Sequence, residues 1–167
     1  MKILGLISDT HIPSRQKKLP NSVIKSFSEV SVDLIIHAGD LEELSVASAL
    51  EEIAPLKAVQ GNMCNSSVKK RYPKKEIISI EDLVIGVTHG SGSPTGYHKR
   101  VISEFNKDPR PDIIVSGHTH QPNAKIENNI LLINPGTPTD RYFASRNTIA
   151  VLEIDGKDYK YYFIEIK

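Results

Sequence analysis

The stretch Ile3–Asp9, ILGLISD, is an apolar run that ends at a carboxylate. An apolar run without alternation is typical of a β-strand that is covered on both faces, as the strands of parallel sheets are. Downstream, Pro20–Val30 carries apolar residues at helical spacing, and Val32–Ala38 is a second strand-like run. The chain is therefore predicted to begin with a strand, a helix and a second strand.

The same alternation continues to about residue 60. Leu41–Ile53 predicts another helix, Pro55 follows it, and Leu56–Val59 predicts a third strand. A βαβαβ order implies parallel strands joined by right-handed crossovers, with the loops after the strands gathered at one edge of the sheet.

The remainder of the chain is predicted to be rich in strands. A helix is expected over Tyr97–Asn106, after the Gly/Ser-rich segment Gly90–Gly96. Strands are expected over Glu76–Ile80, Leu83–Thr88, Asp112–Ser116, Ala124–Glu127, Ile130–Ile133, Thr148–Ile154 and Lys157–Ile166. Because no linker or repeat interrupts this pattern, we expect a single domain over residues 1–167.

The bulk composition argues against several classes of protein. Lys and Arg number 21 against 20 Asp and Glu, so no overall field favours nucleic acid or a membrane. No apolar stretch approaches the roughly 20 residues of a membrane span. Cys64 is the only cysteine, which rules out an intramolecular disulfide, and the N-terminal run lacks a signal-peptide pattern. We expect a cytoplasmic protein.

Side chains that commonly bind metals follow five of the predicted strands. The last and densest group is Val115–His120, VSGHTH, with two histidines one residue apart. Seven such residues follow the ends of predicted strands: Asp9, His11, Asp40, Asn62, His89, His118 and His120. Two carboxylates, one amide and four imidazoles suit divalent transition ions better than Ca²⁺ or a structural zinc site. Seven ligands exceed what one tetrahedral ion takes, so two ions that share a carboxylate are expected.

The order of these motifs resembles that of the calcineurin-like metallophosphoesterase superfamily, in particular its small prokaryotic phosphodiesterase branch. The motifs are Asp9–His11, Gly39–Asp40, Gly61–Asn62, Thr88–Gly90 and Gly117–His120, and Asn134–Thr137 also resembles that branch. The resemblance extends from Met1 to about Arg141. It implies an α/β fold, a four-layer αββα sandwich in which two packed mixed β-sheets are flanked by helices.

The resemblance also implies the role of each residue. Asp9, His11 and His120 would hold one ion, and Asn62, His89 and His118 a second, with Asp40 bridging the two. Asp40, Asn62 and His89 make up the expected catalytic set. The reaction would be in-line attack of a metal-bridging hydroxide on a small phosphodiester, and a nucleotide-like substrate stays open. Manganese is expected first, with nickel, iron, cobalt and zinc as alternatives.

Two positions depart from the family pattern. Met63 stands where many members carry a histidine that protonates the leaving group, and Ser91 where relatives often carry a second histidine. Esters whose leaving groups need little protonation would suffer least from this loss.

Several other features have simpler interpretations. His37 is interpreted as a core histidine and Cys64 as a semi-buried loop thiol. The run Lys69–Lys75, with five cations, is interpreted first as a solvated surface, with steering of an anionic substrate or a nucleic-acid end as the alternative. The segment Gly90–Gly96 is expected to form a mobile rim.

The residues beyond Asn134–Thr137 leave two questions open. Arg141 and Arg146 could pair with a phosphate or with a neighbouring carboxylate, and the structural role is slightly favoured. Tyr142 and Phe143 could supply a homodimer contact.

The rival function is a catalytically weak scaffold or protein-interaction module on the same fold, like the retromer scaffold subunit to which these enzymes are related. Retention of His89, His118 and His120 favours an enzyme, whereas Met63 is what a decaying site would also show.

Overall fold

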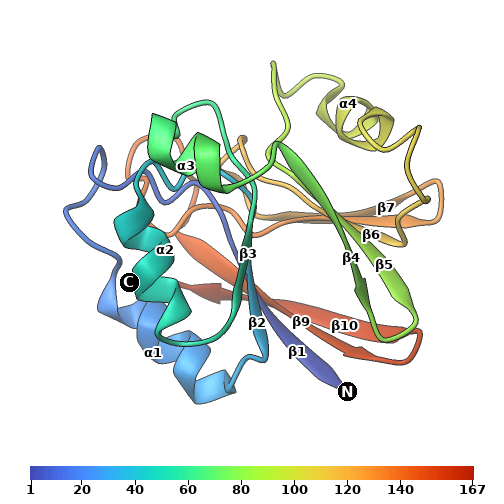
Figure 1. Cartoon of the computed structure of the whole chain (residues 1–167), viewed down its shortest axis with the longest axis horizontal. Helices are drawn as coiled ribbons and strands as arrows, with labels where there is room; N and C mark the ends of the chain where they lie inside the picture. Colours follow the sequence, from blue (N-terminus) through green and yellow to red (C-terminus); the bar gives the residue numbers. More distant parts are fainter.

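The computed structural model describes residues 1–167 and contains two five-stranded β-sheets with helices on their outer faces (Figure 1). The first sheet, in spatial order, consists of β10 (Asp158–Glu165), β9 (Thr148–Asp155), β1 (Lys2–Ile7), β2 (Leu34–His37) and β3 (Leu56–Ala58). The second consists of β4 (Lys75–Ile80), β5 (Leu83–Thr88), β6 (Ile113–Val115), β8 (Ile130–Asn134) and β7 (Asn123–Glu127). Both sheets mix parallel and antiparallel pairs.

Strand β1 is apolar throughout because each of its faces packs against a different layer. Leu4 and Leu6 lie in the core between the sheets, whereas Ile7 packs toward α1 (Asn21–Val30) and α2 (Leu44–Glu51). A Cβ added at Gly5 would lie 2.8 Å from the ring of Phe27, so glycine is needed for α1 to approach this closely. Because successive side chains of a strand point to opposite faces, one face of β1 packs on the helices and the other on the second sheet.

The second sheet is covered in the same way. Ile85, Ile113 and Leu131 face the first sheet. Ile114 lies on the opposite face and packs with Val101 of α4 (Tyr97–Ser103). Figure 1 shows α1 and α2 beside the first sheet and α4 beside the second. The predicted four-layer αββα sandwich of two mixed sheets is therefore confirmed.

The predicted helices and strands are present, with shorter helices. The helix expected over Leu41–Ile53 spans Leu44–Glu51, and that expected over Tyr97–Asn106 spans Tyr97–Ser103. The six-residue helix α3 (Ser66–Arg71) was not predicted. Its cap is Asn65, whose Oδ1 accepts a hydrogen bond from the Val68 amide at 3.0 Å. Beyond this cap the sequence offers only a run of cations, which does not indicate a helix.

The carboxyl ends of the parallel strands lie at one edge of the molecule. Strands β1, β2 and β3 run in one direction in their sheet, and β5, β6 and β8 run in one direction in theirs. The loops that follow them therefore meet, and these loops carry all seven predicted metal ligands. None of the helices is long and apolar enough to cross a bilayer.

Candidate metal centre

The backbone at this edge is held in an unusual conformation. Five of the seven predicted ligands have a positive φ: Asp9 (51°), His11 (43°), Asp40 (56°), His118 (68°) and His120 (59°). Residues with a Cβ avoid this region, at a cost on the order of 1–3 kcal/mol each, and adopt it only where the surrounding contacts impose it. The clustering of these conformations at one site is typical of a functional centre.

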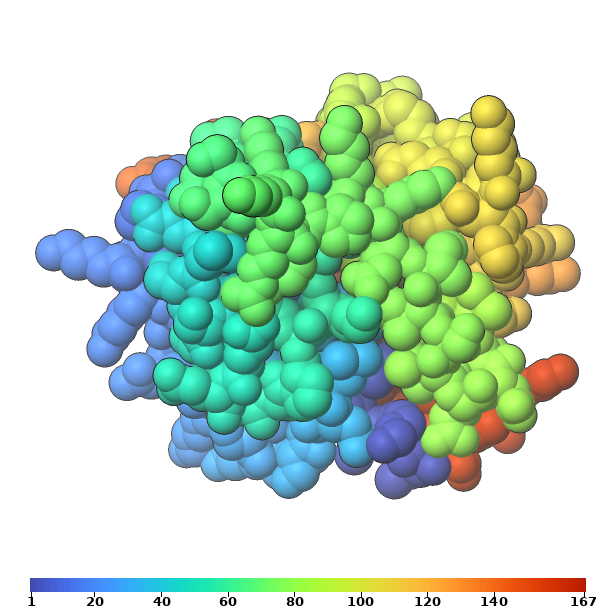
Figure 2. All heavy atoms as spheres, in the orientation of Figure 1, coloured from blue at the N-terminus to red at the C-terminus, as the bar shows by residue number.

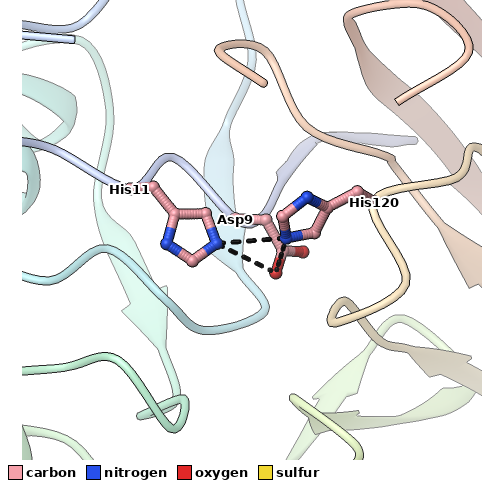
Figure 3. Close-up of side chains that lie close together, drawn as sticks. All are labelled: Asp9, His11 and His120. Carbon is pink, nitrogen blue, oxygen red and sulfur yellow. Dashed lines mark hydrogen bonds and ion pairs between the residues drawn. The ribbon is translucent and has the colours of Figure 1, made fainter. Parts of the chain in front are cut away.

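Asp9, His11 and His120 form the first of two clusters (Figure 3). His120 Nε2 lies 3.4 Å from Asp9 Oδ1, and His11 Nε2 lies 3.8 Å from the same oxygen. The two Nε2 atoms are 3.1 Å apart. Figure 3 shows all three side chains pointing toward one another although they come from two distant loops. One cation could be held by these three atoms.

Asp40, His89 and Asn62 form the second cluster, again with Asp9 close by. His89 Nε2 lies 3.2 Å from Asp40 Oδ2, 3.2 Å from Asn62 Oδ1 and 3.9 Å from Asp9 Oδ1. Asp40 Oδ2 is also 3.7 Å from His11 Nε2. One oxygen of Asp40 therefore faces both clusters, as does Asp9 Oδ1.

His118 lies beside these clusters without joining them. Its Nε2 donates to the Gly92 carbonyl at 3.0 Å, and its ring is 5.3 Å from that of His89 between centroids. It still lines the same cavity, of about 280 Å³, as His11, Asp40 and Asn62. The structure thus brings six of the seven predicted residues into contact and keeps His118 at the cavity wall.

Each of the four histidines has one nitrogen committed to an acceptor. His11 Nδ1 donates to Glu42 at 2.9 Å, His89 Nδ1 to the Ala38 carbonyl at 2.8 Å, and His120 Nδ1 to Asp140. Such partners orient the ring, so that a metal could bind at the opposite nitrogen once any proton there is displaced. The opposite nitrogen is Nε2 in these three residues, where it contacts Asp9 or Asp40, and Nδ1 in His118.

Glu42 and Asp140 are functional residues that sequence reasoning missed. Glu42 stands only two positions after Asp40, and Asp140 follows the recognised Asn134–Thr137 segment, so closeness to motifs was the one available signal. Among 20 acidic residues that signal is weak. Both carboxylates are buried, 6% and 1% exposed, which marks them as partners of buried histidines.

Glycines let the two central carboxylates approach the backbone. A Cβ at Gly117 would lie 2.7 Å from Asp9 Oδ2, and one at Gly61 would lie 2.1 Å from Asp40 Oδ1. In this space Asp9 Oδ2 accepts from the His118 amide at 2.9 Å, and Asp40 Oδ1 accepts from the Met63 amide at 2.7 Å. These contacts explain why glycine precedes the histidine and the asparagine in the two motifs.

Charges at the centre are mutually stabilised. Burial would raise the pKa of Asp9, but a hydrogen bond from His120 and the nearby imidazolium charges hold this pKa at about 2. Burial would lower the pKa of His89, but the hydrogen bond to Asp40 and the charges of Asp9 and Asp40 raise this pKa to about 9. Since a ligating histidine must be neutral, a cation bound here would displace these protons.

Other predicted residues have simpler roles. His37 is a core residue, with Nε2 3.1 Å from Thr10 Oγ1, as interpreted from the sequence. Cys64 is buried and its sulfur accepts from the Gly61 amide, so it is a structural loop thiol. Arg141 and Arg146 are exposed and neither pairs with a carboxylate, so the slightly favoured structural role is wrong.

The segment Gly90–Gly96 is tied to α4 by one side chain. The Arg100 guanidinium donates to the carbonyls of Ser91 (3.1 Å), Thr95 (2.8 Å) and Ser93. The expectation of a mobile rim did not include these contacts, because Arg100 lies beyond the segment in the following helix.

The comparisons with known proteins agree on one family. Residues 1–157 match the model of the calcineurin-like phosphoesterase superfamily domain. A probable metallophosphoesterase of Methanothermobacter thermautotrophicus is 36% identical over 155 residues, which cover 93% of this chain and 87% of that protein. A phosphodiesterase of Methanocaldococcus jannaschii is 30% identical over 179 residues, 99% of this chain and 100% of that protein.

A solved structure with the same fold is that of Vps29 from Chaetomium thermophilum. It superposes with a TM-score of 0.79 and covers 99% of this chain and 98% of its own, at 16% sequence identity. Identity at this level shows a common fold and no more.

Proposed function

This chain belongs to the calcineurin-like phosphoesterase superfamily, and from that premise we propose that it hydrolyses phosphodiesters at a centre of two divalent metal ions. Its relatives are named metallophosphoesterase and phosphodiesterase, so metal-dependent phosphoesterase activity is the function of its class. The number of ions, their identity and the preference for a diester are the parts proposed.

The arrangement of the histidine nitrogens is the observation that carries the proposal. Each ring donates through one nitrogen to a carboxylate or carbonyl, and the acceptors are Glu42, Ala38, Gly92 and Asp140. In His11, His89 and His120 the other nitrogen lies 3.2 to 3.8 Å from a carboxylate oxygen of Asp9 or Asp40, which a histidine that served only the core would not need. The donor set of imidazole, carboxylate and amide also fits divalent transition ions.

The ligands divide into two groups around Asp40. Asp9, His11 and His120 would hold one ion, and Asn62, His89 and His118 the other, with His118 ligating through Nδ1. When bound, two such ions activate water for in-line attack at phosphorus and neutralise charge on the phosphate ester. Manganese is our first choice of ion, because carboxylate and amide oxygens accompany the imidazoles.

The chain's own residues define what the centre can accept. Besides five of the proposed ligands, the cavity is lined by Ser14, Arg15, Glu42, Met63 and Phe143. Glu42 already accepts hydrogen bonds from His11 and from Ser14, whose Oγ donates to it at 2.6 Å. Arg15 does not act as an acid, because an arginine side chain does not give up its proton. No side chain therefore stands ready to protonate a leaving group, which favours esters whose leaving groups need no proton.

The scaffold alternative has no comparable support. The likeness to Vps29 is one of fold, and a scaffold gains nothing from buried carboxylates or from ligands held at positive φ. We therefore retain the enzyme as the proposed function.

Metal analysis combined with turnover tests this proposal. The full chain, reconstituted with Mn²⁺ and desalted, is expected to retain two ions and to hydrolyse bis(4-nitrophenyl) phosphate faster than 4-nitrophenyl phosphate. Turnover of the monoester alone would contradict the diester preference. Absence of both metal and turnover would favour the scaffold.

A further inference from the structure

An exposed aromatic pair and one arginine border the cavity of the metal centre. Tyr142 and Phe143 are 79% and 68% exposed, and neighbouring apolar side chains this exposed commonly mark a binding site. The Arg15 guanidinium carbon lies 5.4 Å from the centroid of the Tyr142 ring and 5.5 Å from that of Phe143. Arg15 and Phe143 line the cavity together with His11 and His120. We call Arg15, Tyr142 and Phe143 the aromatic rim.

The aromatic half of the rim is fixed to a metal-ligand candidate. Asp140 Oδ1 accepts from the amides of Tyr142 (2.8 Å) and Phe143 (3.3 Å), while its other oxygen contacts His120. Gln121, the residue after His120, donates through Nε2 to the Phe143 carbonyl at 2.6 Å. Asp140 therefore anchors the backbone that carries these rings next to His120.

The cationic half is fixed in a parallel way. Glu42 accepts from His11 through Oε1 (2.9 Å) and from the Ser14 amide through Oε2 (3.2 Å), and the Arg15 amide donates to the His11 carbonyl. The Arg15 guanidinium has no carboxylate or carbonyl partner; it faces only the two rings. A cation left unpaired beside a phosphate-binding centre is available to phosphate oxygens.

We propose that the aromatic rim selects phosphodiesters in which one ester oxygen carries an aromatic group, either an aryl ring or a nucleoside with its base. Phe143 stacks on that group, Arg15 donates to the non-bridging phosphate oxygens, and Tyr142 holds the guanidinium in place. This inference rests on the proposed function for the placement of the phosphorus. For an aryl ester it also agrees with the lack of a proton donor, because an aryl oxyanion leaves without protonation.

Binding of unreactive diesters tests the inference without relying on turnover. The full chain, ¹⁵N-labelled and loaded with diamagnetic Zn²⁺, is titrated by NMR with four diesters: diphenyl, dicyclohexyl and dimethyl phosphate, and thymidine 5′-methyl phosphate. Dicyclohexyl phosphate matches diphenyl phosphate in apolar area but has no planar ring. We expect an aromatic diester to bind about tenfold more tightly than the non-aromatic ones. A gain confined to diphenyl phosphate assigns an aryl ester, and a gain confined to the thymidine ester assigns a nucleoside.

Three variants separate the roles within the rim. Phe143→Leu keeps an apolar side chain and should remove the preference for aromatic diesters. Arg15→Gln should weaken all four diesters by about tenfold and keep the preference, because it removes a charge. Tyr161→Leu, at an exposed tyrosine on β10 outside the cavity, should change nothing.

Two results would overturn the inference. One is equal affinity of the wild type for aromatic and non-aromatic diesters, or no binding of any; the other is an aromatic preference that survives Phe143→Leu. Metal content and turnover are measured on a Mn²⁺-reconstituted sample of the same preparation. If metal and turnover are absent but the preference is intact and depends on Phe143, the proposed function is contradicted and the inference is supported. If turnover is normal but the protein shows no preference, the inference alone is overturned.

Discussion

Glu42 Oε1 lies 2.9 Å from His11 Nδ1, and both side chains are buried. A carboxylate in this position fixes which nitrogen of the imidazole carries the proton and makes the opposite nitrogen a stronger donor to a cation. The relationship makes Glu42 part of the centre although it is not one of the proposed ligands.

Replacing Glu42 tests this positioning role. Glu42→Gln should lower the affinity of the Asp9, His11 and His120 cluster for Mn²⁺ by about 10- to 100-fold, because His11 loses its negative partner. Competition with a metal indicator measures the change. Glu43→Gln is the matched control, since Glu43 is exposed and its side chain caps nothing. Equal affinities in the two variants would contradict the prediction.

Asn62 is expected to act mainly on the proposed second ion. Asn62 Oδ1 lies 3.2 Å from His89 Nε2 and contacts none of the other cluster, so Asn62→Ala should weaken the second binding step more than the first. A two-step Mn²⁺ titration by calorimetry distinguishes the steps. Asn106→Ala, at an exposed site after α4, controls for loss of an amide. Equal weakening of both steps would speak against separate sites.

His37 should make stability depend on pH. Burial lowers the pKa of His37 from 6.5 to about 4, so between these values the unfolded chain binds more protons than the folded one. Stability should therefore fall as pH drops from 6.5 toward 4 and be unaffected by His37 above 6.5. The shift corresponds to roughly 3 kcal/mol.

Urea unfolding of the chelator-treated protein at several pH values measures this effect. His37→Leu should flatten the profile between pH 4 and 6.5, and the difference between the two curves isolates His37 from the carboxylates. Parallel curves for the two proteins would show that His37 does not titrate in this way.

The basic run Lys69–Lys75 should contribute little to substrate binding. Arg71 pairs with Glu51 and Lys75 with Asp108, so two of its five cations are already neutralised. The space-filling view shows the green surface around α3 facing solvent (Figure 2). The double variant Lys69→Gln, Lys70→Gln should change kcat/KM less than about threefold at low salt, as expected of solvated charges.

Kinetics at several salt concentrations decide between this interpretation and steering. A salt dependence of KM that is steep in the wild type and absent from the double variant would favour steering of an anionic substrate. Lys25→Gln together with Lys18→Gln, on exposed residues of the N-terminal half, controls for a change in net charge.

Local patterns explain what was predictable. The βαβαβ order and the later strands follow from hydrophobic periodicity, which is a property of neighbouring residues. Helix α3 was missed because its only signal is the cap at Asn65 ahead of a cationic run. The absence of partners for Arg141 and Arg146 could not be known either, because an ion pair depends on where other chain segments lie.

The sequence by itself determined the layered α/β fold and the types of side chain that end its strands, since strand burial and motif order are written into short stretches. Only the tertiary structure decided which nitrogen of each histidine is committed to an acceptor, that Glu42 and Asp140 hold His11 and His120, and that Arg15 lies over Tyr142 and Phe143. Glu42 and His11 are 31 positions apart in the chain, and Asp140 and His120 are 20 positions apart. Contacts at such separations depend on which strands become neighbours and on how the loops after them meet, which no local pattern encodes.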